Sequence, residues 1–599
     1  MSDITRLNLS RRQFVTGATA GGILLGLGLD SYAVGSSPAK NPQVQTLRGN
    51  SFNLAMGYQP VNFTGAQRTA TAINGSVPAP TLRWQEGETV TLRVTNHLAH
   101  DSSIHWHGMI LPTGMDGVPG LSFDGIKPGE TFEYQFEINQ SGTYWYHSHS
   151  GWQEQTGLYG AIVIDPKDPD PVAYDRDYVV LLSDWSDESP DRIYANLKKM
   201  SHYYNFQERT AGDLWKDIKN KGVVQTWKER EMWNTMRMKQ TDISDVTGYA
   251  YTYLMNGATP DTRWTGLFKQ GEKVRLRFIN GSAMSIFDIR IPGLTMTVVA
   301  ADGQNIEPVT IDEFRIGTAE TYDVVVEPNA DSAYAIFAQT IDRSGYALGN
   351  LTPDVAWRAD TPKMDHRPTL GHGDMGMAMN RAGMDHSGHK MNGMSAMNHR
   401  QHGTPPTIVA AGYGNRKSVT ANHHTTEFGP HTDMLAEAPQ NGLHDPGLGL
   451  REHRQRYNRK VLRYADLRNL TSTQDKRDPS REIQLHLTGN MSRYMWSMNG
   501  IKFADAEPLE LTYGERVRIT LVNDTMMTHP IHLHGLWSEL ETGDPDYIPR
   551  KHTILVQPGS QISYLVSADA IGRWAYHCHL MYHMPGMMRE VRVEKGGRG

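Results

Sequence analysis

One pattern of polar and apolar residues occurs three times along the chain. Each copy is a glycine turn followed by alternating polar and apolar residues that end on asparagine, at residues 86–96, 270–280 and 513–523. Alternation places the apolar side chains on one face, so each copy is predicted to be a half-buried strand of an antiparallel sheet. An Asn-Gly pair precedes each copy, at Asn74-Gly75, Asn256-Gly257 and Asn499-Gly500. These repeats predict three copies of one β-sandwich module.

The repeats also locate the histidines. Nine and eleven residues beyond the closing asparagine lie His105 and His107 in the first module, Ile289 and Ile291 in the second, and His532 and His534 in the third. Eighteen and twenty residues beyond a glycine ahead of the last strand lie His147 and His149, then Ala335 and Phe337, then His577 and His579. Unrelated histidines would not keep this register twice and be missing together from one module. We therefore expect a metal centre built by the first and third modules.

Each of the four His-x-His pairs delivers two imidazoles to one side of a strand, because residues i and i+2 share a face. Eight imidazoles are enough for a cluster of three metal ions. The residue between His577 and His579 is Cys578, the only cysteine of the chain. Its side chain is expected to point the opposite way and to bind a separate metal ion. Cys578 and its neighbours would then form a short covalent route for electrons between two metal sites.

Further ligands for this separate site are predicted near Cys578. The candidates are His529, His583 and an axial thioether from Met587 or Met588. Two histidines, a cysteine and a weak methionine are the ligands of blue-copper sites, whereas the alternative, a structural zinc site, normally takes four strong ligands. Anchoring on the Gly586-Met587 pair selects Met587, and counting ten residues from Cys578 selects Met588. Met587 and Met588 therefore both remain candidates for the axial ligand.

Four segments resemble the copper signatures of the multicopper oxidases and occur in the same order. They are His105-Trp106-His107-Gly108, residues 144–149, residues 529–535 and His577-Cys578-His579-Leu580. The chain after its first residues is similar, more narrowly, to the periplasmic copper-resistance members of that family. The resemblance implies an all-β fold of three cupredoxin-like Greek-key β-sandwich domains with four copper ions: one type 1, one type 2 and a type 3 pair.

The resemblance also assigns ligands by motif position. It implies type 2 ligands His105 and His532, type 3 ligands His107, His147, His149, His534, His577 and His579, and type 1 ligands His529, Cys578, His583 and an axial methionine. One departure is that only Met584 and Pro585 separate His583 from Gly586, where the family usually has three residues. Asp116 resembles an acidic residue near the type 2 copper that could relay protons; the alternative is a turn-forming Asp-Gly pair.

The implied activity is oxidation of Cu(I), with phenols as a second substrate class, at type 1 copper, and reduction of O₂ to water at the three-copper cluster. Such a cuprous oxidase, or laccase-like enzyme, would serve copper resistance. The alternative is a copper-sequestering protein in which the oxidase activity is secondary. A laccase that works mainly on organic substrates is a third option. A copper nitrite reductase fits less well, because that family lacks the three-copper cluster.

Composition supports metal chemistry and argues against nucleic acid. The chain has 26 histidines and 29 methionines, and these side chains are neutral ligands that suit copper. A formal net charge of −6 offers no basic excess for a phosphate backbone. The single cysteine excludes an intramolecular disulfide.

The N-terminus indicates export. Arg11-Arg12 precedes an apolar, glycine-rich run over residues 15–29, with small residues after it. This is typical of a twin-arginine signal peptide, so the translocation machinery is a predicted partner and the periplasm the predicted location. The alternative, a membrane anchor, is disfavoured because the run is shorter than a full span. The oligomeric state is not predicted.

These features give a domain plan. We expect a signal peptide at residues 1–39, cupredoxin-like domains at 40–168, 169–357 and 456–599, and a flexible Met/His-rich linker at 358–455. A helical insertion at about 187–246 is predicted in the second domain, as an amphipathic surface helix or as a methionine-bearing cover of the substrate entrance. Residues 364–403 carry methionine or histidine every few positions, which predicts binding of additional copper; the alternative is an inert linker.

Overall fold

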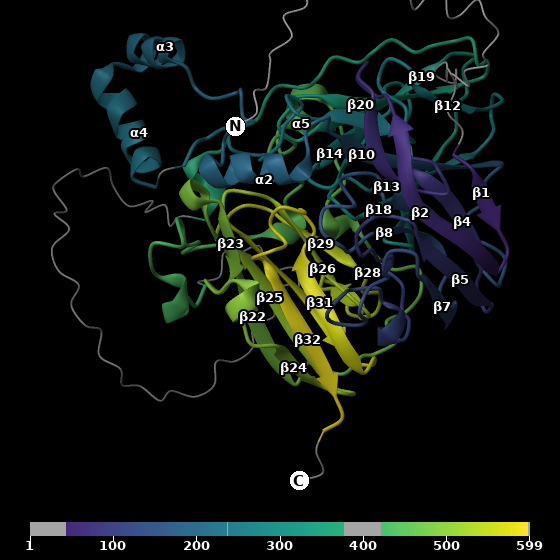
Figure 1. The fold of residues 1–599 in the computed structure, drawn as a ribbon. Coiled ribbons are helices and arrows are strands. Elements are labelled where there is room, and N and C mark those ends of the chain that lie inside the picture. The colour runs from purple at the N-terminus through teal and green to yellow at the C-terminus, as the bar shows by residue number, and fades with distance from the viewer. Residues whose placement is uncertain (1–43, 237, 377–420, 597–599) are drawn as a thin grey trace, which may run out of the picture. The chain divides into compact units, whose positions relative to one another are not determined.

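A computed structural model describes residues 44–236, 238–376 and 421–596, and the predicted signal peptide lies outside this part of the chain. Within the described residues the strands form six sheets, two for each module (Figure 1). The predicted all-β fold of three cupredoxin-like β-sandwiches is confirmed.

The first sandwich contains β1 (Thr46–Arg48), β2 (Ser51–Val61), β3 (Arg68–Ile73), β4 (Ala79–Gln85), β5 (Thr89–Asn96), β6 (His105–His107), β7 (Thr131–Glu137), β8 (Gly142–His147) and β9 (Tyr159–Asp165). One sheet has the order β3-β2-β5-β7 and the other β1-β4-β9-β8-β6. Apolar residues from both sheets, among them Leu92 and Trp106, share one buried core.

The second sandwich contains β10 (Arg176–Trp185), β11 (Thr252–Met255), β12 (Trp264–Leu267), β13 (Val274–Asn280), β14 (Phe287–Arg290), β15 (Met296–Ala301), β16 (Gln304–Ile311), β17 (Glu313–Ile316), β18 (Thr321–Val326), β19 (Tyr334–Thr340) and β20 (Tyr346–Thr352). Its sheets have the orders β11-β10-β13-β18-β15-β16 and β12-β20-β19-β14-β17.

The third sandwich contains β21 (Gln440–Asn441), β22 (Arg481–Asn490), β23 (Met495–Met498), β24 (Leu509–Thr512), β25 (Arg516–Asn523), β26 (His529–Leu533), β27 (Ser538–Leu540), β28 (Arg550–Lys551), β29 (Thr553–Val556), β30 (Ser560–Ser567), β31 (Gly572–Cys578) and β32 (Met588–Glu594). Its sheets have the orders β23-β22-β25-β30-β27-β28, with β21 beside β30, and β24-β32-β31-β26-β29.

The repeated strands β5, β13 and β25 occupy equivalent positions in the three sandwiches. Each pairs in parallel with one neighbour (β2, β10, β22) and antiparallel with the other (β7, β18, β30). The sheets are therefore mixed, and the expected purely antiparallel arrangement was wrong, because alternation reports which face is buried and not the strand direction.

The closing asparagines hold the loops that follow the repeated strands. The side-chain amide of Asn96 donates to the carbonyls of His100 and Ile126, and that of Asn523 donates to the carbonyls of Met527 and Val556. Asn280 does the same in the second module. Each repeat thus fixes the start of the loop that leads into the first His-x-His position of its module.

The prediction of half-buried strands holds for β5 but not for β13 and β25, which are buried along their whole length. The polar face of β13 is covered by the first module. Arg277 of β13 donates to Thr143 Oγ1 of β8 at 2.9 Å, and it also pairs with Asp323 of β18, in its own module, at 3.0 Å. Buried charges need partners. The alternating pattern could not predict that this face is buried, because a buried arginine with an acidic partner gives the same pattern as an exposed arginine.

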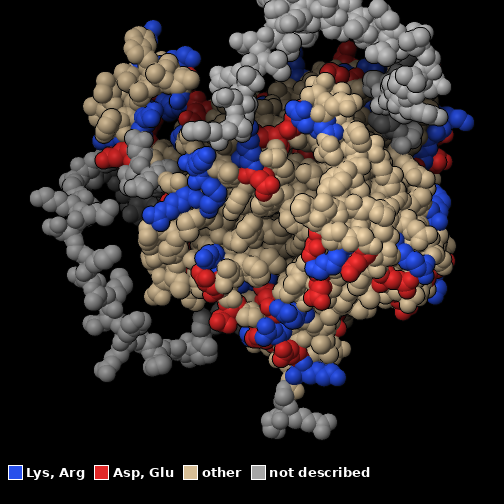
Figure 2. Space-filling model, in the orientation of Figure 1, with Lys and Arg blue, Asp and Glu red and all other residues tan. Residues whose placement is uncertain are grey.

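The insertion of the second module forms α2 (Pro190–Lys199), α3 (Ala211–Lys221) and α4 (Val223–Met236), and a short α5 (His453–Tyr457) lies between β21 and β22 (Figure 1). None of the helices in the described residues is long and apolar enough to cross a membrane. Charged side chains of both signs are interspersed over the face seen in Figure 2.

The first described part of the expected flexible linker, residues 358–376, contacts the sandwiches. Leu370 and Met375 are buried in the core shared by the second and third modules, and Asp365 is paired with Arg459. The methionines and histidines of residues 377–403 lie outside the described residues.

Candidate metal centre

Strand register brings the four His-x-His pairs together. β6 pairs with β8, so that His105 lies opposite His147, and β26 pairs with β31, so that His532 lies opposite His577. Both strand pairs belong to the five-stranded sheets of their modules. The first and third modules therefore present their pairs on the same kind of sheet, as the sequence spacing indicated.

All eight imidazoles meet between these modules. The Nε2 atoms of His534 and His577 are 3.0 Å apart, and those of His149 and His577 are 3.4 Å apart. The rings of His107 and His532 stack with their centroids 3.7 Å apart. Several triplets of these ring nitrogens lie close enough to share one metal ion, among them His105, His107 and His147.

The Nδ1 atoms of several of these imidazoles are held by hydrogen bonds. His105 donates to the carbonyl of Asp116 at 2.7 Å, His534 to Oδ2 of the same residue at 2.9 Å, and His532 to the carbonyl of His552 at 2.6 Å. A hydrogen bond at Nδ1 fixes the tautomer and leaves Nε2 with a free lone pair.

The donor atoms of this cluster fit a set of metal ions. The buried Nε2 atoms of His105, His107, His147, His532 and His579 have no hydrogen-bond partner among the described residues. Burial lowers the pKa of His107, His147 and His579 well below the usual value of histidine, which keeps these rings neutral. Neutral imidazole is the form that ligates metal ions.

A second set of donor atoms surrounds Cys578, which points to the opposite face from His577 and His579. Its Sγ atom lies 3.4 Å from Nδ1 of His529 and 3.8 Å from Nδ1 of His583, and these two nitrogens are 3.2 Å apart. Burial raises the pKa of the Cys578 thiol, so a thiolate here requires a neighbouring cation. The remote Nε2 atoms are hydrogen-bonded, His529 to Thr525 at 2.7 Å and His583 to Asp245 at 2.6 Å. The set of Cys578, His529 and His583 therefore fits a soft metal ion.

The two candidate axial methionines lie on different faces. Met588 is the partner of His577 in the β31–β32 ladder and packs with Val118 and Ala575. The backbone N–H of Cys578 donates to the carbonyl of Met587, and the buried Met587 side chain belongs to the same core cluster as Cys578. Cross-strand partners share a face, so this register favours Met587 as the methionine beside the thiol.

Three residues of the centre were missed by the sequence analysis. Oε2 of Glu154 lies 2.8 Å from Nδ1 of His147, Asp245 accepts from His583, and the buried ring of His552 lies 4.8 Å from that of His107. None occupies a repeated position, so no spacing rule could find them. Glu154 also lines a small cavity of about 10 Å³ beside His149 and His577, enough for about one water molecule.

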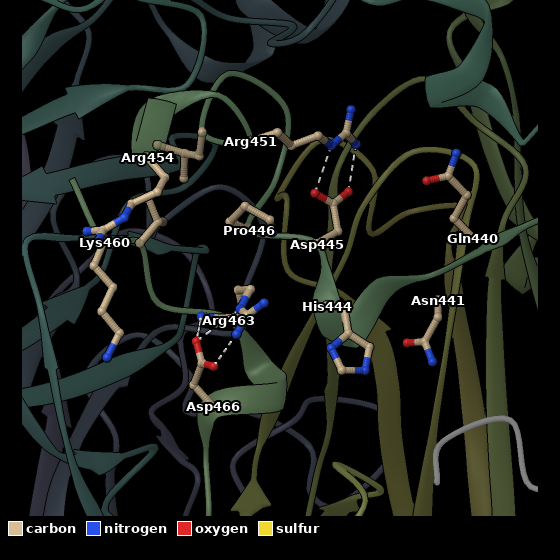
Figure 3. Close-up of a pocket in the computed structure, with 12 residues that line it drawn as sticks. Gln440, Asn441, His444, Asp445, Pro446, Arg451, Arg454, Lys460, Arg463 and Asp466 are labelled. Carbon is tan, nitrogen blue, oxygen red and sulfur yellow. Dashed lines mark hydrogen bonds and ion pairs between the residues drawn. The ribbon is translucent and has the colours of Figure 1, made fainter. Parts of the chain in front are cut away.

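A separate surface pocket of about 690 Å³ lies near α5 (Figure 3). Its charged lining is largely paired: Arg451 binds Asp445 with two hydrogen bonds, and Arg463 binds Asp466 at 2.6 Å. We assign this pocket no part in the metal chemistry.

Comparisons with known sequences cover most of the chain. Three family models described as multicopper oxidase match residues 55–169, 176–353 and 476–597. A "Copper resistance protein A homolog" of Pseudomonas syringae pv. tomato is 55% identical over 98% of this chain and 99% of its own length. The "Copper resistance protein A" of Escherichia coli is 53% identical, over 98% of this chain and 100% of its own length.

Solved structures share the fold at low sequence identity. The laccase from Botrytis aclada has a TM-score of 0.60 at 21% identity, covering 92% of this chain and 88% of its own. A multi-copper oxidase from Pseudomonas Thermotolerans has a TM-score of 0.56 at 19% identity, covering 92% of this chain and 100% of its own.

Proposed function

This chain belongs to the multicopper oxidase family and is thus a copper-dependent oxidoreductase, and from this premise we propose that it oxidises Cu(I) and reduces O₂ to water in the periplasm. Phenols are a second substrate class, and the role in the cell is copper resistance. The two relatives that are 55% and 53% identical to this chain over nearly its full length carry copper resistance in their names, which supports this role.

One observation carries the proposal. Cys578 faces His529 and His583, while His577 and His579, its neighbours in sequence, face the cluster of eight imidazoles. One peptide unit on each side of Cys578 therefore links the two sets of donor atoms covalently. Such a link suits an enzyme that takes electrons at one site and delivers them at the other.

We assign the ligands accordingly, for four copper ions. Type 1 copper would be held by His529, Cys578, His583 and Met587, and type 2 copper by His105 and His532. The type 3 pair would be held by His107, His147, His149, His534, His577 and His579. When bound, the copper ions would accept single electrons from the reductant and supply them to O₂. Additional copper on residues 364–403 remains a prediction.

Asp116 is proposed to serve the cluster in two ways. Its carboxylate accepts from His534 at 2.9 Å and lies 3.3 Å from Nδ1 of His105. It therefore orients one imidazole of the first module and one of the third. It is also buried, with one carboxylate oxygen lacking a hydrogen-bond partner among the described residues. That oxygen can accept and pass on the protons that reduction of O₂ consumes.

The surroundings of His583 support Cu(I) over a bulky phenol as the main substrate. His583 is fully buried, and its outer nitrogen is covered by Asp245, which also accepts from the Tyr494 hydroxyl at 2.9 Å. Lys198 of α2 donates to the carbonyl of Tyr494 at 2.8 Å, so the insertion closes over this side. A buried carboxylate attracts a small cation, whereas a phenol ring would need an open surface at the imidazole edge.

The cysteine variant Cys578→Ser tests the proposal. Copper-loaded wild-type protein is expected to show an intense blue absorption band, a second cupric spin-resonance signal and O₂ uptake with Cu(I). The variant is expected to lose the band and nearly all of the O₂ uptake, because the thiolate and the covalent route are both removed. Retention of both properties in the variant would contradict the proposed mechanism.

A further inference from the structure

Two histidines and two carboxylates converge in the third module, away from the residues assigned above. His423 lies just before the 3₁₀ helix η3 (Thr425–Glu427), and Glu427 ends that helix. His486 lies on β22, and Asp524 follows the last residue of β25. Three segments of the chain, residues 423–427, β22 and the end of β25, thus contribute side chains to a site that the multicopper oxidase signatures do not include.

The four donor atoms of these residues face one another. Nδ1 of His423 is 2.8 Å from Glu427 Oε2 and 3.5 Å from Asp524 Oδ2. Nδ1 of His486 is 2.7 Å from Asp524 Oδ2 and 3.4 Å from Glu427 Oε2. Ligands on a tetrahedral ion at about 2.0–2.1 Å lie about 3.4 Å apart. The two longer separations match this value, and the two shorter ones are hydrogen-bond distances that a bound cation would lengthen. The ligand atoms around Cys578 show a similar spacing, 3.2 to 3.8 Å.

The hydrogen bonds of His423 point to the same conclusion. Its Nε2 atom lies 3.3 Å from the carbonyl of Ala436, and its Nδ1 atom lies at hydrogen-bond distance, 2.8 Å, from Glu427 Oε2. A neutral ring carries a proton on one nitrogen only, so in the tautomer that donates to Ala436 the lone pair of Nδ1 faces two carboxylate oxygens that can only accept. A cation among these three atoms removes the repulsion. The carbonyl of Ala436 orients the ring for this, as a carbonyl orients a metal-binding histidine.

Burial makes a bound cation more favourable. The side chains of Glu427, His486 and Asp524 are fully buried. Glu427 Oε1 and His486 Nε2 have no hydrogen-bond partner among the described residues. Two carboxylates removed from water are costly unless nearby positive charge compensates them. A divalent cation would match their charge.

We propose that His423, Glu427, His486 and Asp524 bind a divalent transition-metal ion, Cu(II) or Zn(II). Imidazole suits both ions and carboxylate oxygen completes the shell, whereas the absence of sulfur from this set disfavours Cu(I). The ion would fasten residues 421–436 to β22 and β25, beside Ala436, whose backbone N–H donates to Asp524 Oδ1 at 2.7 Å. The site is a metal-held joint, separate from the redox centre.

Metal content of purified protein tests the joint. Wild type, His423→Gln, Glu427→Gln and the control His424→Gln are incubated with excess Cu(II) or Zn(II), desalted, and analysed by mass spectrometry of the metals. His424 is the exposed neighbour of His423, so it controls for loss of a histidine. We expect wild type and the control to retain one more equivalent of Cu or Zn per chain than the two site variants. Equal content in all four proteins would overturn the site.

A second measurement needs no variant. Crystals of the unaltered protein, measured at the copper and zinc absorption edges, should show an anomalous peak bonded to His423 Nδ1, His486 Nδ1 and the two carboxylates; the edge identifies the ion. A map without a peak there would overturn the site. The blue band and O₂ uptake are expected to be the same in all variants, so failure of this site is distinguishable from failure of the proposed oxidase.

Discussion

At the scale of single residues, the centre depends on groups that touch the ligands. Asp116 and Asp245 each accept a hydrogen bond from an imidazole of the centre, and Glu154 lies 2.8 Å from Nδ1 of His147. Partners of this kind typically change metal affinity or activity 10- to 100-fold when they are removed. Asp245 is the most informative, because its carboxylate beside His583 is also the group proposed to favour Cu(I) over phenols.

We predict that Asp245→Asn lowers kcat/KM for Cu(I) about tenfold and lowers activity with a phenol less. The amide keeps the shape but loses the charge that would attract Cu(I). O₂ uptake with each substrate measures this, together with the absorption band of type 1 copper, which should remain. Asp331→Asn, an exposed change in the second module, is the control. An equal loss with both substrates would mean that Asp245 only positions His583.

At the scale of elements, the chain needs glycine in the turns that directly follow His107 and His534. Gly108 and Gly535 have φ values of +81° and +68°, and a Cβ atom at Gly535 would overlap the indole of Trp574. Glycine adopts such φ values without strain, whereas other residues do so at a cost. These turns redirect the chain as it leaves β6 and β26, so they fix where the second histidine of each pair lies.

Gly535→Ala is predicted to destabilise the protein by more than Gly514→Ala. Both positions have positive φ, +68° and +85°, but nothing lies within 4 Å of an added Cβ at Gly514. The control variant should lose about 1–2 kcal/mol from strained backbone alone, and Gly535→Ala should lose about 1–3 kcal/mol more from overpacking. Denaturant unfolding of the two variants measures the difference, and equal losses would contradict a steric role for Trp574.

The elements also show how far the sequence could be interpreted. The repeats located β5, β13 and β25 and placed every His-x-His pair, because local alternation and spacing carry that information. The mixed sheets and the buried polar face of β13 were not predictable, because they depend on contacts between modules such as Arg277 with Thr143. Asp245 and Glu427 were missed for the same reason: Asp245 lies in the predicted helical insertion and Glu427 in the predicted linker, and only the fold brings each of them to a histidine.

At the scale of the whole molecule, an ion pair joins the two ends of the predicted Met/His-rich linker: Asp365 lies near its start, and Arg459 lies just after its end. Asp365 accepts from Gln339 of β19 at 2.5 Å and from Arg459 at 2.8 Å. Burial alone would raise the pKa of Asp365, but the hydrogen bonds from Arg459 and Gln339 and the nearby guanidinium charges outweigh it and lower the pKa from 3.8 to about 2. Asp365 thus favours the folded state as long as it is ionised.

Asp365→Asn is therefore predicted to cost about 2 kcal/mol at pH 7. The pKa is lower in the folded than in the unfolded protein, so the stabilisation is complete above about pH 4 and is lost as the pH falls toward 2. The difference in unfolding free energy between wild type and variant should shrink over that range. A difference that stays constant between pH 7 and pH 3 would mean that charge at Asp365 is not the cause.

The two described flanks of residues 377–420 meet at one place. A Cβ at Gly376 would lie 3.0 Å from that of Ala436, Ala438 donates to the carbonyl of Gly376 at 2.8 Å, and Ala421 packs against Ala436. The chain therefore leaves and returns beside the same residue. Contacts among described residues hold these flanks together, so replacement of residues 377–420 is expected to leave the sandwiches folded.

We predict that a short Gly/Ser linker in place of residues 377–420 leaves the blue band and phenol-driven O₂ uptake unchanged and lowers the number of Cu(I) ions bound. Thioethers and imidazoles are the groups removed, and both bind Cu(I). A full-length variant with every Met and His of this stretch changed to Ser separates ligand loss from shortening. If cells carrying either variant lose copper resistance while Cu(I)-driven O₂ uptake persists, sequestration is the main role; if resistance follows the rate of Cu(I) oxidation, the oxidase is.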